Sequence, residues 1–373
     1  MPSLHSRLFI YAFAFAAASL VRAQTYTYTI TNLGNLGGSS SSSIAQPQAY
    51  ATSINNSGQI VGSAYTASRV EHAFLYQNGA MTDLTATYGN TIGAAKSINN
   101  SGMIAGTLNN AVGSYTISAG GTVTTVGTMY VNKLNPSGLL VGSDTNYPNV
   151  AAQNSGGTTT SLGTFGGTQS SAYGINTAGT IVGYATSNGS STFKPFVYSG
   201  GTMTNLGNLG GNGEGIAYDI NDAGTIVGYS KNASGYSTAF SYVNGTITSL
   251  GQLNSGRNSV ANAINASGTI VGFAVNGPSG RQEAVIFNGA GSITSLSSLV
   301  DLSSAGFSYL TQALDINDLG QIVGYGVPIG GSLSAQQAFL LTPLAPVPEP
   351  ATTAAIAGVL ALGTVVFFRN RRR

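Results

Sequence analysis

Residues 54–62 read INNSGQIVG, and this nine-residue phrase, Ile-Asn-x-x-Gly-x-Ile-Val-Gly, recurs along the chain with few changes. Seven copies are present, and they begin at Ile54, Ile98, Leu134, Ile175, Ile220, Ile264 and Ile316. Their starts are separated by 44, 36, 41, 45, 44 and 52 residues. A period of this length is typical of four-stranded propeller blades and exceeds that of leucine-rich repeats.

Each copy of the phrase predicts a β-hairpin. In the first copy Asn55 can begin a type I turn through its own side chain, and Gly58 supplies the left-handed residue that leads into the next strand. A second phrase, such as AFSYVNGTITSL at residues 239–250, predicts another hairpin around an Asn-Gly turn. Two hairpins make a four-stranded unit. The glycine-rich run at residues 206–211 predicts the connection from the outer strand of one unit to the inner strand of the next.

The two ends of the repeat region complement one another. The last copy lacks a fourth strand, whereas residues 27–38, TYTITNLGNLGG, nearly duplicate residues 201–211, GTMTNLGNLGG, and precede the first phrase. We therefore predict an all-β protein, a seven-bladed propeller within residues 24–342 whose seventh blade is completed by residues 27–36. Closure removes the apolar end that an open array has to cap. An open β-solenoid is the alternative fold.

The composition is typical of an extracellular β-protein. Of 373 residues, 6% are charged, 52 are glycine and none is cysteine or tryptophan. Between Gln24 and Val347 there are seven Lys or Arg and ten Asp or Glu, a net charge of −3. This balance provides no basic stripe for a phosphate backbone, so nucleic acid is not expected as a partner. The lack of cysteine excludes disulfides and thiolate chemistry.

Residues 1–23 are predicted to be a secretory signal peptide. Arg7 lies in a short n-region, residues 8–20 are apolar, and Val21-Arg22-Ala23 fits a cleavage site between Ala23 and Gln24. A retained anchor helix is the alternative, although the apolar stretch is short for a bilayer.

The C-terminus is predicted to anchor the chain in a membrane. A Pro-rich linker at residues 343–350 precedes eighteen uncharged residues, 351–368, which are long enough for one transmembrane helix. The tail that follows, residues 369–373, is basic and should stay cytoplasmic, which leaves the propeller on the exported side. Its charges are Arg369, Arg371, Arg372 and Arg373.

Two segments carry resemblances to known families. Val347-Pro348-Glu349-Pro350, with the apolar stretch and the basic tail, resembles the PEP-CTERM sorting signal of bacteria. That resemblance implies an exosortase as processing partner, transient membrane anchoring, and transfer to the cell surface or medium in organisms that make extracellular polysaccharide. An ordinary C-terminal anchor is the alternative. His72-Ala73-Phe74 and the phrase at residues 54–62 resemble the bacterial extracellular HAF repeat, over residues 27–342. Only this copy carries the histidine, so no family role rests on His72.

Few residues offer catalytic chemistry. The mature chain has one histidine, His72, and no P-loop, dinucleotide fingerprint or nucleophile elbow. Two copies of the phrase carry carboxylates, for which turn formation is favoured over a glycosidase pair or calcium. These carboxylates are Asp219, Asp222, Asp315 and Asp318. We predict no catalytic residue, no metal site and no cofactor.

Aromatic residues follow several copies of the phrase. They are Tyr184, Tyr229, Phe273 and Tyr325. Packing between blades is favoured for them over stacking platforms for sugars. The predicted function is an exported, matrix-associated, non-catalytic binding or structural module with exopolysaccharide or another glycan as candidate ligand. A secreted carbohydrate-active enzyme on the same scaffold is the alternative.

Overall fold

The computed structural model describes residues 27–38, 48–109, 112–145, 149–255, 257–289 and 291–344. The predicted signal peptide and cleavage site, the motif at residues 347–350, the apolar residues 351–368 and the basic tail lie outside these ranges. Within them, no helix combines the length and the apolar character that crossing a bilayer requires. The described residues therefore cover the repeat region alone.

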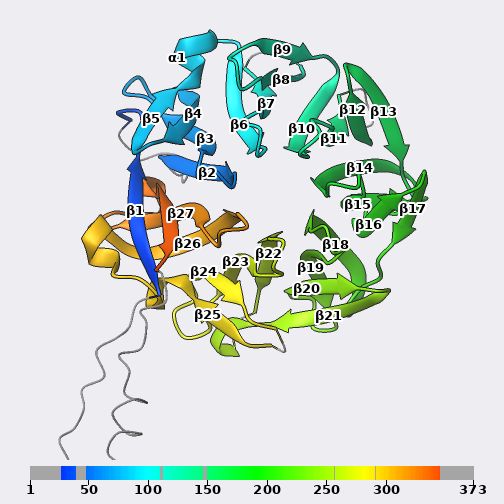
Figure 1. Ribbon diagram of the computed structural model, residues 1–373. Helices are drawn as coiled ribbons and strands as arrows, with labels where there is room; N and C mark the ends of the chain where they lie inside the picture. Colours follow the sequence, from blue (N-terminus) through cyan, green and yellow to red (C-terminus); the bar gives the residue numbers. More distant parts are fainter. Residues whose placement is uncertain are drawn as a thin grey trace, which may run out of the picture.

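Seven four-stranded antiparallel sheets, counted over the described residues, form a ring around a central axis (Figure 1). Two cavities lie along this axis between the inner strands, and we call this space the channel. The predicted seven-bladed propeller is confirmed, and the open solenoid is wrong. In blades 1 to 6 the strands follow one another in sequence, and the first strand of each blade lies nearest the channel.

Blade 1 contains β2 (Ala49–Ile54), β3 (Ile60–Tyr65), β4 (Glu71–Gln77) and β5 (Ala80–Asp83), and blade 2 contains β6 (Ile92–Ile98), β7 (Ile104–Leu108), β8 (Ser114–Ile117) and β9 (Val123–Val126). Blade 3 contains β10 (Met129–Leu134), β11 (Leu140–Asp144), β12 (Ala151–Ser155) and β13 (Thr158–Gly163), and blade 4 contains β14 (Gly166–Ile175), β15 (Ile181–Ser187), β16 (Lys194–Ser199) and β17 (Thr202–Asn205). Blade 5 contains β18 (Gly210–Ile220), β19 (Ile226–Asn232), β20 (Ser237–Val243) and β21 (Thr246–Gly251), and blade 6 contains β22 (Ser259–Ile264), β23 (Ile270–Val275), β24 (Gln282–Phe287) and β25 (Ile293–Ser295).

Blade 7 is built from both ends of the repeat region. It contains β26 (Phe307–Ile316), β27 (Ile322–Pro328), β28 (Gln337–Pro343) and β1 (Tyr28–Gly34). Strand β1 pairs antiparallel with β28, with Ile30 opposite Leu341, and it forms the outer edge of the blade. The predicted closure by the N-terminal strand is confirmed.

Helical structure is confined to short connections in the described part of the chain. The helix α1 (Leu84–Tyr88) follows β5, and its N-cap, Asp83, accepts a hydrogen bond from Ala86 N. The 3-10 turns are η1 (Leu253–Ser255), η2 (Leu296–Ser298), η3 (Leu302–Ala305) and η4 (Leu333–Ala335).

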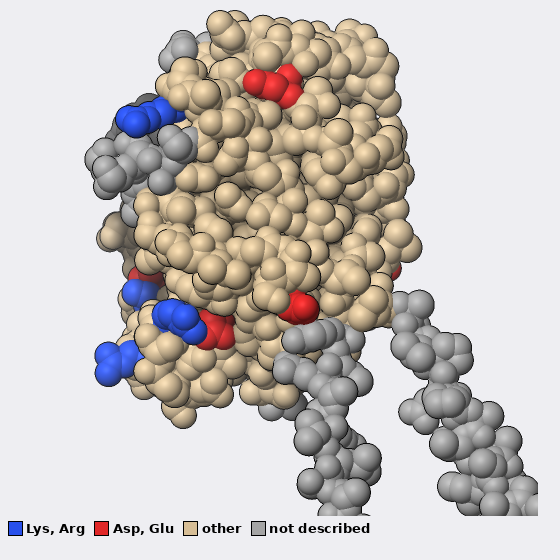
Figure 2. All heavy atoms as spheres, turned by 90° about the vertical axis from the view of Figure 1, so that its left-hand side faces the viewer, with Lys and Arg blue, Asp and Glu red and all other residues tan. Residues whose placement is uncertain are grey.

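The blades pack face to face through apolar residues of both phrases. Phe74, Phe196, Phe240 and Phe339, from the second hairpin of four blades, are completely buried. The clusters join neighbouring blades, since Val182 of blade 4 lies in one cluster with residues of blade 5. Figure 2 shows that charged side chains are sparse on the outer wall near blade 7, in keeping with a charged fraction of 6%.

The turns adopt the backbone geometry that their residues predict. Gly58 has φ +74°, which is the left-handed conformation that glycine adopts without strain. Asn244 and Gly245, between β20 and β21, both have positive φ, as a two-residue type I′ hairpin requires.

Every inner strand contains a β-bulge at the same place. In each blade the pairing register between the first and second strands skips the residue three positions before the Asn of the phrase. The seven bulged residues are Thr52, Lys96, Asn132, Tyr173, Tyr218, Asn262 and Leu314. A bulge bends its strand and redirects a side chain.

The last glycine of each phrase faces this bulge. A Cβ atom on Gly62 would lie 2.1 Å from the carbonyl oxygen of Tyr50, and one on Gly228 would lie 2.0 Å from that of Ile216. Only a residue without a side chain allows this approach. Turn geometry predicts the glycine at Gly58, whereas the requirement for glycine at Gly62 comes from the bulge.

Candidate binding site in the central channel

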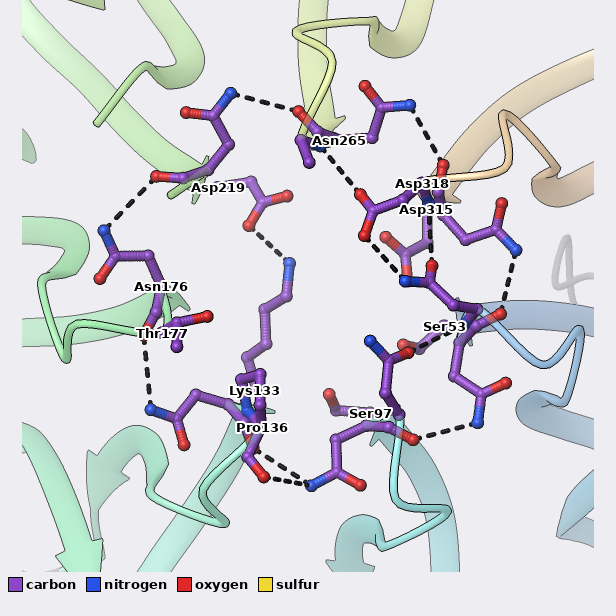
Figure 3. A pocket seen from close by; sticks show the side chains of 18 of the residues that line it. Ser53, Ser97, Lys133, Pro136, Asn176, Thr177, Asp219, Asn265, Asp315 and Asp318 are labelled. Carbon is purple, nitrogen blue, oxygen red and sulfur yellow. Dashed lines mark hydrogen bonds and ion pairs between the residues drawn. The ribbon is translucent and has the colours of Figure 1, made fainter. Parts of the chain in front are cut away.

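A belt of seven buried asparagines surrounds the channel (Figure 3). Each is the Asn of one phrase, and its Nδ2 donates a hydrogen bond to the backbone carbonyl of the corresponding Asn in the next blade, at 3.0–3.4 Å. The belt consists of Asn55, Asn99, Asn135, Asn176, Asn221, Asn265 and Asn317, and the last donates to the first. Since each bond crosses a blade boundary, the belt links all seven blades.

The same side chains hold their own turns. In every copy the Asn Oδ1 accepts a hydrogen bond from the backbone N–H four residues later, as Asn55 does from Gln59 N at 3.0 Å. The predicted side-chain turn at Asn55 is therefore confirmed. An aspartate could make this turn but, when ionised, could not donate to the next blade. The double role accounts for asparagine in all seven copies.

The bulged residues converge on a cavity of 340 Å³ in the channel, which we call the tyrosine cavity. Its lining residues are Thr52, Ser53, Lys96, Ser97, Asn132, Lys133, Tyr173, Tyr218, Asn262, Ala263, Leu314 and Asp315. A second cavity, of 180 Å³, lies at the asparagine belt. Because Ser53, Ser97, Lys133 and Asp315 line both cavities, these four side chains lie between them.

Five of the seven bulged residues contact a neighbouring blade, in two different ways. Thr52, Asn132 and Asn262 each donate a side-chain hydrogen bond of 2.8–2.9 Å to a backbone carbonyl of the next blade. In blades 4 and 5 the position holds Tyr173 and Tyr218, whose rings meet edge to face at 5.4 Å between centroids. Burial raises the pKa of both hydroxyls, so the two tyrosines are neutral at physiological pH.

These two tyrosines belong to a row of five aromatic rings. The row runs from Phe193 through Tyr184, Tyr173 and Tyr218 to Tyr229, with successive centroid distances of 4.2, 6.1, 5.4 and 6.1 Å. Tyr184 and Tyr229, for which packing between blades was predicted, are in the row, but each meets a tyrosine on the inner strand of its own blade, and the contact between blades 4 and 5 is made by Tyr173 and Tyr218. The two rings that line the cavity were not predicted, although their position before the Asn was readable in the sequence.

The other two aromatic residues of that prediction lie apart from this row in the described structure. Phe273 is on β23 and Tyr325 is on β27. Tyr325 lines a separate cavity of 430 Å³ with Arg281, whose guanidinium lies 4.4 Å from the ring centre of Tyr309. Burial raises the pKa of Tyr325 to about 12.

Two of the repeated carboxylates face the channel. Lys133 Nζ lies 2.5 Å from Asp219 Oδ1, while Asp219 Oδ2 accepts a hydrogen bond from Ile264 N and Asp315 Oδ2 accepts one from Ile54 N (Figure 3). Both aspartates thus cap an inner strand of a following blade. Burial acts to lower the pKa of Lys133, but the two carboxylates outweigh it and the pKa is raised. Burial raises the pKa of Asp315, and Lys133 offsets part of that rise.

The other two repeated carboxylates are exposed on the rim of the channel. Asp222 accepts hydrogen bonds from the backbone N–H and the hydroxyl of Thr177, both at 2.8 Å. Asp318 accepts from Ala266 N at 2.9 Å and from Asn56 Nδ2 at 2.8 Å. Each therefore bonds to a turn in a neighbouring blade, a partner that turn propensity alone did not indicate. No group of three or more His, Asp or Glu in the described residues is arranged to hold a metal ion.

His72 lies at the start of β4, the third strand of blade 1, and not on the inner strand that lines the channel. Its Nδ1 is 2.7 Å from Oδ2 of Asp83, whose other oxygen caps α1. The side chain of His72 is half-buried. The contact fixes α1 against the second hairpin of blade 1, which favours the structural interpretation of this histidine.

Comparison with known proteins identifies a domain model and a shared fold. Residues 203–329 match the model of a protein family of unknown function, DUF3466. No curated protein matches the chain. A puromycin-hydrolyzing peptidase from Mycobacterium tuberculosis aligns over 88% of this chain and 58% of its own length, at 12% identity and a TM-score of 0.51.

Two further solved structures are similar at a lower score. A gluconolactonase from Xanthomonas campestris aligns over 84% of this chain and 89% of its own, at 9% identity and a TM-score of 0.40. TolB from Acinetobacter baumannii aligns over 52% of each chain, at 14% identity and a TM-score of 0.40. The chain thus spans about half the length of TolB. These similarities concern the propeller fold alone.

Proposed function

We propose that this protein is an exported, non-catalytic module of the cell surface or extracellular matrix that binds glycan in the tyrosine cavity. The observation that carries the proposal is the ring of bulges, which directs the non-repeated side chain of every inner strand into one cavity. Concave sites lined by aromatic rings and a few polar groups are the usual sites for small ligands. Bulges are over-represented beside functional sites.

The polar side chains of the channel favour ligand binding over catalysis. Asp219 and Asp315 accept backbone N–H bonds of a following blade, and Lys133 is paired with Asp219. Because these three side chains bond to other parts of the protein, their main effect is to stabilise the ring of blades. Amide and hydroxyl groups provide most of the remaining polar lining, and such groups bond well to sugar hydroxyls.

One observation favours the alternative of a carbohydrate-active enzyme. Asp219 is paired with a lysine while burial raises the pKa of Asp315, so the two carboxyls have different environments. Pairs of this kind serve as acid and base in glycosidases. We nevertheless favour the binding module, because both carboxyls are already bonded to backbone N–H groups.

A glycan-binding screen run beside a hydrolysis assay on the same polymers tests the choice. The proposal predicts retention of at least one exopolysaccharide without new reducing ends. Turnover that is lost in Asp219→Asn or Asp315→Asn would establish the enzyme instead. Neither binding nor turnover on any polymer would refute both.

Export rests on the two terminal segments. The signal-peptide pattern of residues 1–23 and the PEP-CTERM resemblance at residues 347–373 support passage through the export pathway, a transmembrane pause at residues 351–368, and processing by an exosortase. Intact-mass analysis of protein from its native cells tests this. We expect a chain that begins at Gln24, and a cytoplasmic species with both ends retained contradicts the proposal.

A further inference from the structure

The two lysines of the tyrosine cavity differ in their surroundings. Lys133 is paired with Asp219 and is also stabilised by Asp315. Among the described residues, no carboxylate lies within ion-pairing distance of Lys96, which is half-buried at the bulge of β6. Lys96 therefore has no ion-pair partner among the described residues, whereas Asp315, which lines the same cavity, accepts a hydrogen bond from Ile54 N and acts on Lys133.

The charge of Lys96 contrasts with the rest of the propeller. Residues 24–347 carry a net charge of −3, so attraction of anions by the molecule as a whole does not explain a lysine at this place. The charge is local to the cavity, where burial reduces screening by solvent and salt. An anionic group of a ligand that enters the channel would be bound by Lys96 directly.

The tyrosine pair supplies a different kind of contact in the same cavity. Tyr173 and Tyr218 meet edge to face, and Tyr184 and Tyr229 support them from the second strands. Rings fixed in this way lose little conformational entropy when a ligand binds. Their faces accept flat apolar surfaces, such as the C–H face of a sugar ring. Their neutral hydroxyls are hydrogen-bond donors and acceptors.

We propose that the tyrosine cavity recognises an acidic sugar, a pyranose ring that bears a carboxylate, with the ring against Tyr173 and Tyr218 and the carboxylate at Lys96. The proposal rests on the proposed glycan-binding function and adds its ligand class. A neutral sugar uses the rings alone, and a simple anion uses the lysine alone. Only an acidic sugar uses both groups that line this cavity.

Binding to three probes by the purified full-length protein tests the proposal. The probes are an oligogalacturonate, its neutral methyl ester and polyglutamate, an anionic polymer without sugar rings. We expect the oligogalacturonate to bind about ten-fold more tightly than either of the others, as one charge-assisted hydrogen bond provides.

Four variants separate the contributions of charge and ring. Lys96→Met should reduce the affinity for the acid about ten-fold and leave that for the ester unchanged. Replacing both tyrosines, Tyr173→Ala with Tyr218→Ala, should weaken both sugars. The matched controls are Lys194→Met, on β16, and Tyr130→Ala, which is 38% exposed on β10, because neither residue lines the cavity. Both controls should bind like the wild type.

The outcomes distinguish this inference from the function on which it rests. Equal binding of acid and ester, unaffected by Lys96→Met, overturns the acidic ligand and leaves glycan binding intact. Polyglutamate binding as tightly as the oligogalacturonate overturns recognition of the ring. Sugar binding that survives all cavity variants places the site elsewhere. Absence of binding to any glycan, in this series and in the wider screen, overturns the proposed function itself.

Discussion

Two positions in each blade, three residues apart, differ in how far their residues vary: one is the bulge of the inner strand and the other is the Asn directly after that strand. The Asn of the phrase is the same in all seven blades, whereas the bulged position carries Thr, Lys, Asn, Tyr, Tyr, Asn and Leu in chain order. Both face the channel. The constant position links the blades in all seven copies. The variable position lines the tyrosine cavity, and in three blades its residue, Thr52, Asn132 or Asn262, also bonds to the next blade. A repeat protein thus keeps identical the residues that its ring requires and varies those that a ligand can contact.

The largest expected effect comes from opening the ring, on which the belt depends. Deleting residues 24–38 removes β1, exposes the edge of β28, and should cost about 5 kcal/mol or more in the free energy of unfolding, since a paired strand and the buried Leu33 are lost. Chemical denaturation measures this. The reference is the mature chain itself, which lacks only residues 1–23 and should unfold at a higher denaturant concentration. Closure is wrong if the longer deletion unfolds at the same concentration.

A second variant breaks the geometry that separates the two positions. Gly228→Ala places a Cβ atom 2.0 Å from the carbonyl oxygen of Ile216, so the bulge at Tyr218 has to shift, at a cost of about 3 kcal/mol. Glycan binding should fall as well, because Tyr218 moves with the bulge. The control is Gly224→Ala, which has φ +81° and nothing within 4 Å, and should cost about 1 kcal/mol from backbone strain alone. Equal costs would show that the bulge tolerates a side chain.

The belt itself is tested by Asn221→Asp, which keeps the acceptor for Thr225 N but, when ionised, cannot donate to Asn265 O. We expect a loss of about 2 kcal/mol at neutral pH, because a buried carbonyl loses its donor and a charge is buried. The introduced carboxyl should have a raised pKa, since burial disfavours its charged form. Acidification protonates it and restores a donor, so the variant should regain stability relative to the wild type as the pH falls. A pH-independent loss would argue against the belt.

The sequence predicted the parts of this fold that repeat. The number of phrases, their spacing and the displaced fourth strand were enough for seven blades and for closure at residues 27–36. Turn residues such as Gly58 act locally, so their roles could be predicted from neighbouring residues. None of these inferences needed the position of one blade relative to another.

The candidate site depends on contacts between neighbouring blades, which one copy of the phrase does not indicate. The belt forms only when Asn Nδ2 bonds to the backbone carbonyl of the next blade. The one signal for it in the sequence is that all seven copies have asparagine, although Ser and Asp also begin turns. The signal for the bulge is the last glycine of the phrase, such as Gly62, because the turn does not require a glycine at that position. Tyr173 and Tyr218 were overlooked because they occupy the position that does not repeat.

The smallest expected effect is the dependence of stability on pH at Asp315. Burial raises the pKa of this carboxyl above its ordinary value of 3.8, so the folded state retains a proton that the unfolded state has lost. The wild type should therefore lose stability as the pH rises from about 4 through the raised pKa. Asp315→Asn, which keeps an acceptor for Ile54 N, should lack this loss. A wild-type slope in Asp315→Asn would contradict the assignment.

The central claim is that the constant position supports the ring while the variable position binds the ligand. Two substitutions in blade 5 test it together: Tyr218→Thr, on β18, introduces the residue that blade 1 has at Thr52, and Asn221→Asp lies in the turn directly after β18. Unfolding and oligogalacturonate binding are measured on both variants. We expect Tyr218→Thr to lose at least about ten-fold in affinity with a cost of at most about 1 kcal/mol in stability, and Asn221→Asp to lose about 2 kcal/mol while the folded protein still binds. A stability loss in Tyr218→Thr as large as that in Asn221→Asp, with unchanged binding, would contradict the account.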